Sequence, residues 1–155
     1  MALELLKDKW STTINKLVIG ATKDEGGTRK STVTVGGEST MPLLLDEGDV
    51  PHKPVVAIEI LDTPPSDWPQ ELAQHFSDVS DDPAKWAKKC VEKYKAELIC
   101  LKLQGTHPDF GDRSADDAAK TVKSVLEAVG VPLIILGSGD DQKDNAVLAK
   151  VSEAW

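Results

Sequence analysis

Apolar and polar positions follow a repeating pattern in the second part of this 155-residue chain. Three short apolar runs, at 54–61, 98–103 and 133–136, have the length and β-branched content of buried strands. A segment with apolar residues every three or four positions follows each run, as expected of amphipathic helices. Strands that are apolar on both faces and alternate with helices predict a parallel sheet with right-handed crossovers.

The predicted helices begin at recognisable capping residues. Three prolines within 63–69 predict a long loop, and Asp82 before Pro83 then predicts an N-cap with proline at the first helical position. Ser114, with Asp117 three positions on, resembles a capping box, and a third helix is predicted over 144–155. The apolar faces consist of Ala87, Cys90, Val91 and Tyr94; of Ala115, Ala118, Ala119, Val122, Val125, Leu126 and Val129; and of Val147, Val151, Ala154 and Trp155.

Residues 1–53 have a different character. Residues 18–19 and 33–35 are strand-forming, and Gly26 and Gly27 between them supply the positive-φ positions that a reversing loop needs, which predicts an antiparallel flap. The sequence therefore predicts a helix and β-hairpin extension over 1–53, followed by a regular α/β domain over 54–155. The residues that predict one short amphipathic helix within 1–17 are Leu3, Leu5, Leu6, Trp10, Ile14 and Leu17.

The three strand and helix units predict an α/β fold that forms part of a (β/α)8 TIM barrel. A complete barrel has eight such units in roughly 250 residues, so we expect only its first three units here, preceded by the hairpin flap. A small open sheet covered on both faces is the alternative, but the chain lacks the flanking strands that such a sheet would need.

Charge and composition exclude several function classes. The net charge of -8 argues against a nucleic-acid partner, because clustered lysines and arginines carry phosphate-backbone binding. No apolar run is long enough for a membrane span, and the N-terminus lacks a secretory pattern, so we expect a cytoplasmic protein without a membrane partner. Cys90 and Cys100 have no metal-ligand spacing, which predicts two small buried hydrophobes and no metal site.

Ligands of parallel α/β proteins bind at the carboxyl ends of the strands. The polar residues predicted there are Asp62, Gln104, Ser138 and Asp140, and these are the candidate cofactor-binding residues. The pattern Gly137-x-Gly139 lacks the third glycine of a dinucleotide site, and no phosphate-binding loop motif occurs. No acid/base pair or activated nucleophile stands out, so no catalytic residue is predicted.

Two charged residues interrupt the apolar strands. Glu59 lies within the first run and Lys102 within the second. Because a lone charge is costly to bury inside a barrel, we expect these two side chains to form an ion pair or polar network near the barrel axis.

Four segments together resemble a known family: VIGATKDEGGTR at 18–29, VGGE at 35–38, DPAKWAKKCV at 82–91 and VGVPL at 129–133. The chain is similar to the small subunit of the corrinoid iron-sulfur protein, the delta-type subunit of the acetyl-CoA decarbonylase/synthase system. The resemblance spans essentially the whole chain, but it covers only the N-terminal half of the complete barrel that members of this family carry.

This resemblance implies a methyl-carrier subunit rather than a stand-alone enzyme. A cobalt corrinoid would be shared with a large subunit, and that subunit would carry the [4Fe-4S] cluster, in agreement with the few cysteines here. In such systems the cobalt takes a methyl group from methyltetrahydrofolate through a methyltransferase and passes it to acetyl-CoA synthase in the reductive acetyl-CoA (Wood-Ljungdahl) pathway of anaerobic carbon fixation. The protein supplies shelter and orientation for the cofactor.

Two alternative functions stay open at this point. A pterin-binding methyltransferase of similar barrel type would hold methyltetrahydrofolate through amide and carboxylate groups at the strand ends, with Asp62 and Gln104 as candidates. A truncated module with only a subunit-interaction role would be anchored by the flap at residues 20–37.

Overall fold

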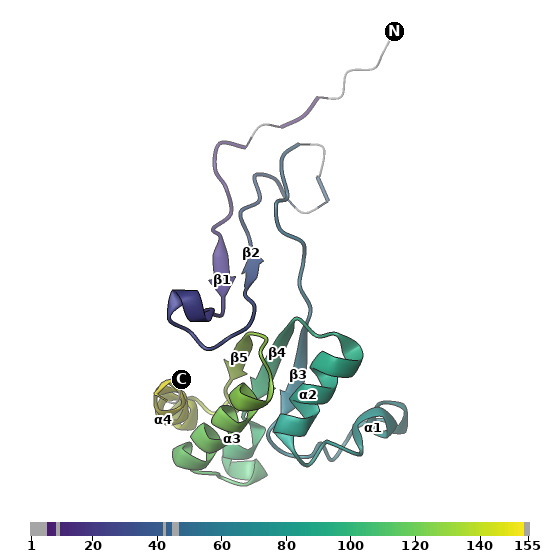
Figure 1. Cartoon of the computed structure of the whole chain (residues 1–155), viewed down its shortest axis with the longest axis vertical. Helices are drawn as coiled ribbons and strands as arrows, with labels where there is room; N and C mark the ends of the chain where they lie inside the picture. The colour runs from purple at the N-terminus through teal and green to yellow at the C-terminus, as the bar shows by residue number, and fades with distance from the viewer. Residues whose placement is uncertain (1–5, 9, 42, 45–46, 154–155) are drawn as a thin grey trace.

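The computed structural model describes residues 6–8, 10–41, 43–44 and 47–153, which form a mixed α/β chain with two separate sheets (Figure 1). A two-stranded hairpin precedes a three-stranded parallel sheet, and helices connect the parallel strands. The helices and strands are β1 (Leu17–Ile19), η1 (Lys23–Glu25), β2 (Val33–Val35), β3 (Ala57–Leu61), α1 (Gln70–Phe76), α2 (Pro83–Tyr94), β4 (Leu98–Lys102), η2 (Gln104–Thr106), η3 (Pro108–Phe110), α3 (Ala115–Ala128), β5 (Leu133–Leu136) and α4 (Asp141–Ser152).

The parallel sheet has the order β3-β4-β5, which confirms the three predicted strands. Its register pairs Ile60 with Leu101 and Leu101 with Ile135. These side chains share one face of the sheet, and Ile60 and Leu101 are fully buried beneath α2 and α3. The two helices cross this face together (Figure 1). They complete the core with Trp86, Ala87 and Cys90 of α2 and with Ala118, Val122, Val125 and Leu126 of α3. The second part of the chain is therefore a mixed α/β fold with a parallel sheet.

The opposite face of the sheet carries Glu59, Cys100 and Ile134 in register. Glu59 is exposed, and the other two are half-buried. The predicted ion pair between Glu59 and Lys102 is wrong, because Lys102 lies opposite Leu61, two residues along, and no ion pair joins the two charges. Water can reach Glu59 on this face, so its charge needs no internal partner.

The helix starts confirm two capping predictions and correct one boundary. The Asp82 carboxylate accepts hydrogen bonds from the backbone N–H of Ala84 at 3.1 Å and of Lys85 at 3.2 Å. The Ser114 hydroxyl accepts from the Asp117 N–H at 3.1 Å. α4 begins at Asp141 rather than at residue 144, because the preceding Asp140 serves as its N-cap.

The long loop predicted between the prolines of 63–69 and the N-cap Asp82 contains a helix, α1, which was missed. This helix begins directly after Pro69 and docks on α2 through aromatic rings. The ring centroids of Trp68 and Trp86 lie 5.3 Å apart in an edge-to-face arrangement, and those of Phe76 and Trp86 lie 5.7 Å apart. Because edge-to-face pairs add attraction beyond their buried area, this tertiary contact favours a helix that the local prolines do not indicate.

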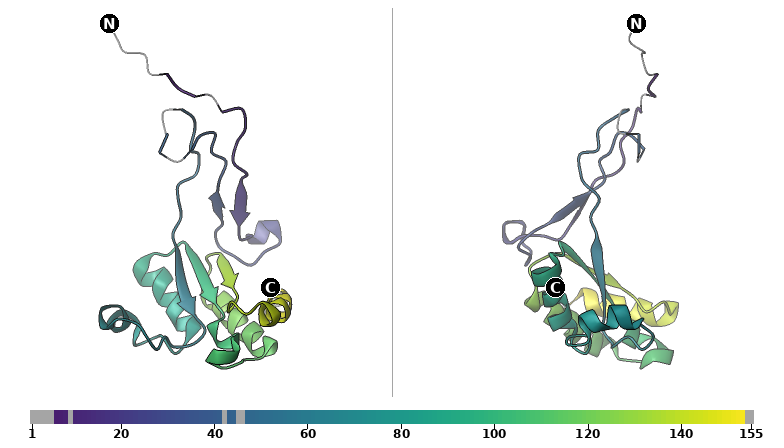
Figure 2. Two further views of the ribbon diagram at one scale, coloured as in Figure 1. Left: turned by 180° about the vertical axis from the view of Figure 1, so that it is seen from behind. Right: turned by 90° about the vertical axis from the view of Figure 1, so that its right-hand side faces the viewer.

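The hairpin flap is confirmed, but the helix predicted ahead of it is wrong. β1 and β2 pair antiparallel with Leu17 opposite Val35 and Ile19 opposite Val33. Residues 6–8 and 10–16 contain no helix, and the Ile14 backbone instead bonds to residues 37 and 38, which extends the hairpin pairing. Leu3 and Leu5 of that prediction lie outside the described residues. The two further views show the hairpin projecting from the parallel sheet, with the extended segment 47–56 beside it (Figure 2).

The cysteines have different surroundings. Cys90 is fully buried, as predicted, and burial raises the pKa of its thiol to about 11. Cys100 is only half-buried on the open sheet face, where burial and the negative charge of Glu59 raise its thiol pKa. Within the described ranges, no helix combines the length and apolar character of a membrane span.

Candidate functional site at the carboxyl edge of the sheet

The carboxyl ends of the three parallel strands meet at one edge. Leu61, Lys102 and Leu136 are in register at the ends of β3, β4 and β5. Backbone pairing continues one residue further, since the Asp62 N–H donates to Lys102 O at 3.1 Å and the Leu103 N–H to Leu136 O at 2.9 Å. The predicted residues Asp62, Gln104, Ser138 and Asp140 all follow these strand ends.

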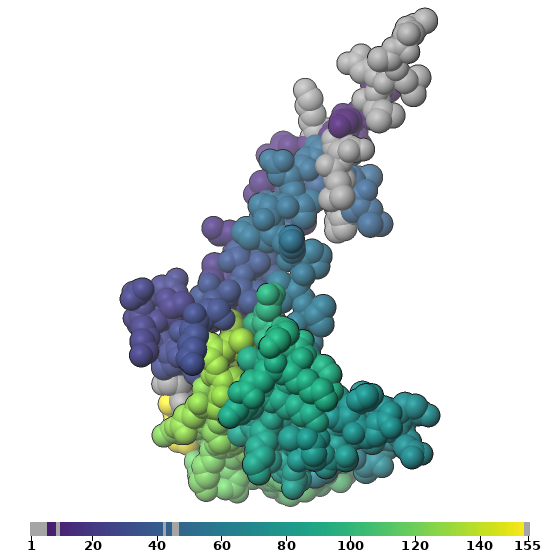
Figure 3. Space-filling model, turned by 45° about the vertical axis from the view of Figure 1, so that its right-hand side comes forward, coloured from purple at the N-terminus to yellow at the C-terminus, as the bar shows by residue number. Residues whose placement is uncertain are grey.

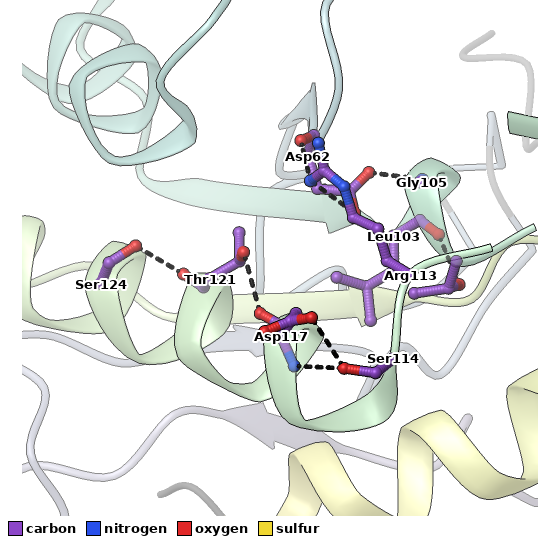
Figure 4. Close-up of polar contacts among 9 residues, drawn as sticks. Asp62, Leu103, Gly105, Arg113, Ser114, Asp117, Thr121 and Ser124 are labelled. Carbon is purple, nitrogen blue, oxygen red and sulfur yellow. Dashed lines mark hydrogen bonds and ion pairs between the residues drawn. The ribbon is translucent and has the colours of Figure 1, made fainter. Parts of the chain in front are cut away.

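Asp62 is a buried carboxylate directly after β3, an outer strand of the sheet (Figure 4). Its Oδ1 accepts a hydrogen bond from the Gly105 N–H at 2.8 Å. Arg113 donates from Nη1 to the Asp62 backbone oxygen at 2.8 Å, and the same Nη1 lies 3.7 Å from Oδ2. Oδ2 is buried without a hydrogen-bond partner in the described part of the chain. Burial raises the pKa of Asp62, while the Gly105 bond and the Arg113 charge act in the opposite direction.

Gly105 allows the backbone after β4 to approach Asp62 closely. A Cβ atom at this position would lie 2.7 Å from Thr63 Cγ2 and 3.0 Å from Asp62 Oδ2. The first distance is shorter than real Cβ contacts and the second is tight, so a side chain here would force the turn or its neighbours to shift. The Thr106 hydroxyl closes the same turn by donating to Leu103 O at 2.8 Å.

Asp144 organises the turn between β5 and α4. Its Oδ1 accepts from the Ser138 backbone N–H at 2.8 Å and from the Ser138 hydroxyl at 2.9 Å, and its Oδ2 accepts from the Gly139 N–H at 2.9 Å. Burial acts to raise the pKa of Asp144, but these hydrogen bonds outweigh it and the pKa is lowered. Gly137 is needed beside this carboxylate, because a Cβ there would lie 2.3 Å from Asp144 Oδ2.

The four candidate residues therefore differ in what they can offer a ligand. Ser138 is bound to Asp144, and Asp140 accepts from the Lys143 N–H at 2.8 Å as the N-cap of α4. The side chain of Gln104 makes no hydrogen bond within the described part of the chain and is half-buried. The groups without a hydrogen-bond partner in the described part of the chain are thus the Gln104 amide, Asp62 Oδ2 and Asp140 Oδ2, and of these the Asp62 oxygen is buried.

Two residues that organise this edge were missed from the sequence. Arg113 directly precedes the N-cap of α3, and Asp144 lies in the first turn of α4. An acidic residue in a first helical turn is an ordinary complement to the helix dipole, so nothing in the local pattern distinguished Asp144. No group of three histidine, cysteine, aspartate or glutamate side chains in the described ranges could hold a metal ion.

Comparison with known proteins identifies the family. Residues 16–155 match the family model described as CO dehydrogenase/acetyl-CoA synthase delta subunit. The acetyl-CoA decarbonylase/synthase complex subunit delta of Archaeoglobus fulgidus is 41% identical over 150 residues, which cover 97% of this chain and 33% of that protein. The acetyl-CoA decarbonylase/synthase complex subunit delta of Methanothermobacter thermautotrophicus is 45% identical over 128 residues, which cover 83% of this chain and 32% of that protein.

The chain therefore spans about a third of the length of the curated relatives that it matches. The family match covers nearly the entire chain, and the flap and all three strand and helix units lie within it. This chain belongs to the CO dehydrogenase/acetyl-CoA synthase delta subunit family.

Proposed function

We propose that this chain is part of a cytoplasmic corrinoid-binding subunit that carries methyl groups within an acetyl-CoA decarbonylase/synthase complex. In this role it receives a methyl group derived from methyltetrahydrofolate, through a methyltransferase, and passes it to acetyl-CoA synthase. The observation that carries the proposal is the family match over residues 16–155. The relatives are named as subunits of a complex, which supports a role with partner proteins rather than alone.

The proposal includes a closed barrel in the full-length subunit. The sequential order β3-β4-β5 and the helices on one face of the sheet agree with the first three units of a (β/α)8 barrel. The other face, which carries Glu59 and Cys100, would become the barrel interior when further strands close the sheet. The Cys100 thiol and the Glu59 carboxylate would then be shielded from water.

The carboxyl edge offers partial support for a cobalt corrinoid. The periphery of a corrinoid carries amide groups, which the Gln104 amide could bind as both donor and acceptor. Asp62 Oδ2 is a buried acceptor without a partner and could accept from one such amide after a small local opening. Ser138 shapes the edge because its hydroxyl already donates to Asp144, and Asp140 caps α4 through Oδ1. A bound corrinoid would supply the cobalt centre that accepts and releases the methyl group.

The proposed partner is a large subunit that shares the corrinoid and carries the [4Fe-4S] cluster. Such a cluster takes four cysteine ligands, whereas this sequence contains two cysteines. Cys90 lies on the buried face of α2 and Cys100 on β4, so neither occupies the kind of exposed loop that would bring it to a shared cluster.

Co-purification tests this proposal. The 155-residue chain is expressed with and without a large corrinoid-binding subunit, and the visible absorption spectrum of the purified material is recorded before and after reduction. We expect a stable complex whose spectrum shows a corrinoid that responds to reduction. A chain that binds neither the large subunit nor corrinoid contradicts the proposal, as does saturable binding of methyltetrahydrofolate by the chain alone, which would indicate a pterin-binding methyltransferase.

A pair of glutamine variants tests the carboxyl edge. Gln104→Ala should weaken corrinoid retention about fivefold to tenfold, because it removes one hydrogen-bonding group. Gln74→Ala on α1 is the matched control, since its exposed side chain bonds to Glu71 O at 3.1 Å and belongs to none of the turns directly after the strands. Equal retention by the two variants would remove Gln104 from the site while leaving the carrier role intact.

A further inference from the structure

The flap and the end of α3 enclose a cleft that the carrier role does not use. Residues 28–30 of the flap lie against residues 126–130, where α3 ends and the chain turns into β5 (Figure 3). The cleft has a volume of about 530 Å³, and Lys123 stands on its wall. This volume is within the range of ordinary small-molecule sites. The cleft lies at the amino ends of the strands, opposite the edge formed by Asp62 and Gln104.

A second lobe of about 240 Å³ adjoins this cleft. It shares Lys30 and residues 128–130 with the first lobe and adds Lys88 of α2. Lys30 lines both lobes, and its side chain lies against Gly130. A Cβ atom on Gly130 would be 2.6 Å from Lys30 Cδ and 2.8 Å from its Cγ. Glycine at position 130 therefore leaves room for the aliphatic stem of Lys30, a residue that lines both lobes.

The carbonyl groups at the end of α3 would by themselves repel an anion, because a helix C-terminus carries a partial negative charge. Arg29 removes this obstacle. Its guanidinium donates to Leu126 O at 2.9 Å and to Val129 O at 2.8 Å. The neighbouring Gly130 O accepts from the Lys30 backbone N–H at 2.7 Å. The flap thus covers the negative helix end with a bonded positive charge.

The charges around the two lobes favour a negatively charged ligand. Four basic residues line them against two acidic residues, in a chain whose net charge is -8. Lys30 and Lys123 form no ion pair within the described part of the chain, and Lys88 makes only an exposed contact of 3.8 Å with Glu92. The basic residues are Arg29, Lys30, Lys88 and Lys123, and the acidic residues are Glu92 and Glu127.

We propose that this flap cleft binds a small organic polyanion bearing phosphate groups. Lysine ammonium groups are compact charges with three donors each, and they bind phosphate oxygens without demanding a planar, two-pronged geometry. Thr28 and Ser31 also line the lobes, and the partly exposed Val91 and Val131 provide apolar surface for the organic part. The ligand would bridge the flap, α2 and α3, so its binding would hold the flap on the core.

Calorimetric titration of the 155-residue chain with pyrophosphate tests this proposal, with inorganic phosphate and a short polyglutamate peptide as comparison ligands. We expect saturable pyrophosphate binding that is tighter than phosphate binding and weakens as salt is added, because the site is exposed to solvent. Amide NMR signals of residues 28–30 and 129–130 should shift on binding. Absence of saturable binding overturns the proposal, and tighter binding of the peptide than of pyrophosphate overturns the assignment to a small polyanion.

Charge-matched variants locate the site. Lys30→Gln combined with Lys123→Gln should weaken pyrophosphate binding roughly tenfold or more. The control combines Lys7→Gln with Lys53→Gln, which removes the same charge from exposed positions outside the cleft; it should stay within about twofold of the parent chain. Circular dichroism confirms that both variants are folded. Equal weakening in the two variants would show binding by net charge alone and would overturn the proposed site.

Discussion

The guanidinium of Arg29 donates a hydrogen bond to the backbone oxygen of Leu126, 97 positions further along the chain, at 2.9 Å. A second bond of 2.8 Å to Val129 O makes the contact two-pronged. A loop of the hairpin therefore caps the last turn of α3, whose terminal carbonyl groups lack partners within the helix. The sequence places these residues in separate segments, and only folding brings them together.

Replacing Arg29 by alanine should detach the flap loop. The variant loses two charge-assisted hydrogen bonds and leaves helix-end carbonyl groups without their cation, so the free energy of unfolding should fall by about 1–3 kcal/mol. Urea titration followed by tryptophan fluorescence measures this loss. Hydrogen exchange of the Lys30 amide, which bonds to Gly130 O, should accelerate at the same time.

Lys23→Ala is the control for the Arg29 variant. Lys23 is exposed in η1 of the same flap, so its removal should change stability by no more than about 0.5 kcal/mol. If the two variants lose the same stability, the guanidinium contact with α3 is not what holds the flap.

Asp62→Asn should change how stability depends on pH. Burial raises the pKa of Asp62 in the folded chain above its ordinary value of 3.8, so the folded state holds the proton more strongly than the unfolded state. This group's contribution is therefore present at low pH and is lost as the pH rises from 3.8 through the folded-state pKa. Relative to the parent, the variant should gain stability as the pH rises through that window.

Urea unfolding of both proteins between acid and neutral pH measures the difference for Asp62→Asn. Asp67→Asn is the control, because Asp67 is exposed and lies in the loop that follows the same strand. The difference between the control and the parent should show no such rise with pH. A difference for Asp62→Asn that falls as the pH rises would mean that the Arg113 charge dominates and that the Asp62 pKa is lowered.

Asp144→Ala should destabilise the turn between β5 and α4. The variant loses a carboxylate that accepts from two backbone N–H groups and one hydroxyl, which we expect to cost about 1–2 kcal/mol at neutral pH. Asp141→Ala, in the first turn of the same helix, is the control and should cost only about 0.3–1 kcal/mol. Thermal and urea unfolding compare the two.

The pH dependence of the Asp144 effect has the opposite sign to that of Asp62. The hydrogen bonds lower the pKa of Asp144 in the folded chain despite its partial burial, so its contribution is complete above 3.8. It is lost as the pH falls below that value through the folded-state pKa. The stability difference between the parent and Asp144→Ala should therefore shrink in acid; an unchanged difference would exclude the carboxylate charge as its source.

Gly105→Ala should destabilise the chain by overpacking. The new Cβ would lie 2.7 Å from Thr63 Cγ2, 3.0 Å from Asp62 Oδ2 and 3.1 Å from Arg113 Cδ, and we expect a loss of about 1–3 kcal/mol. Adding Thr63→Ser removes the nearest methyl group and keeps the hydroxyl. The double variant should recover part of the loss, which a double-mutant cycle measures. Strict additivity of the two changes would rule out the clash with Thr63.

Much of the fold could be predicted, and the errors share a cause. Strands β3, β4 and β5 and the caps Asp82 and Ser114 depend on residues near one another in the sequence, and they were predicted. α1 was missed because its stability depends on distant contacts: Phe76 at its end and Trp68 just before it both pack against Trp86 of α2. The helix expected within 1–17 does not form in the described part of that segment, since Ile14 pairs with the chain beyond the hairpin.

The candidate site, too, could be predicted only in part. That Asp62, Gln104, Ser138 and Asp140 lie at one edge follows from parallel strands with polar residues after their carboxyl ends. Which of these groups can still bind a ligand depends on Gly105, Arg113 and Asp144, whose contacts with them are set by packing. Local patterns do not reveal such partners, because a hydrogen bond between distant segments leaves no periodic trace.

By itself, the sequence determined the alternation of strands and helices, the hairpin and the family resemblance, because these rest on period, turn chemistry and the order of short motifs. Tertiary structure decided that Asp62 is buried with one oxygen unpaired, that Glu59 stays exposed, and that Arg29 caps α3 and completes a basic cleft. Those outcomes depend on which surfaces meet and how far water reaches, and the free energy of a charge is determined by its surroundings in space rather than by its neighbours in the chain.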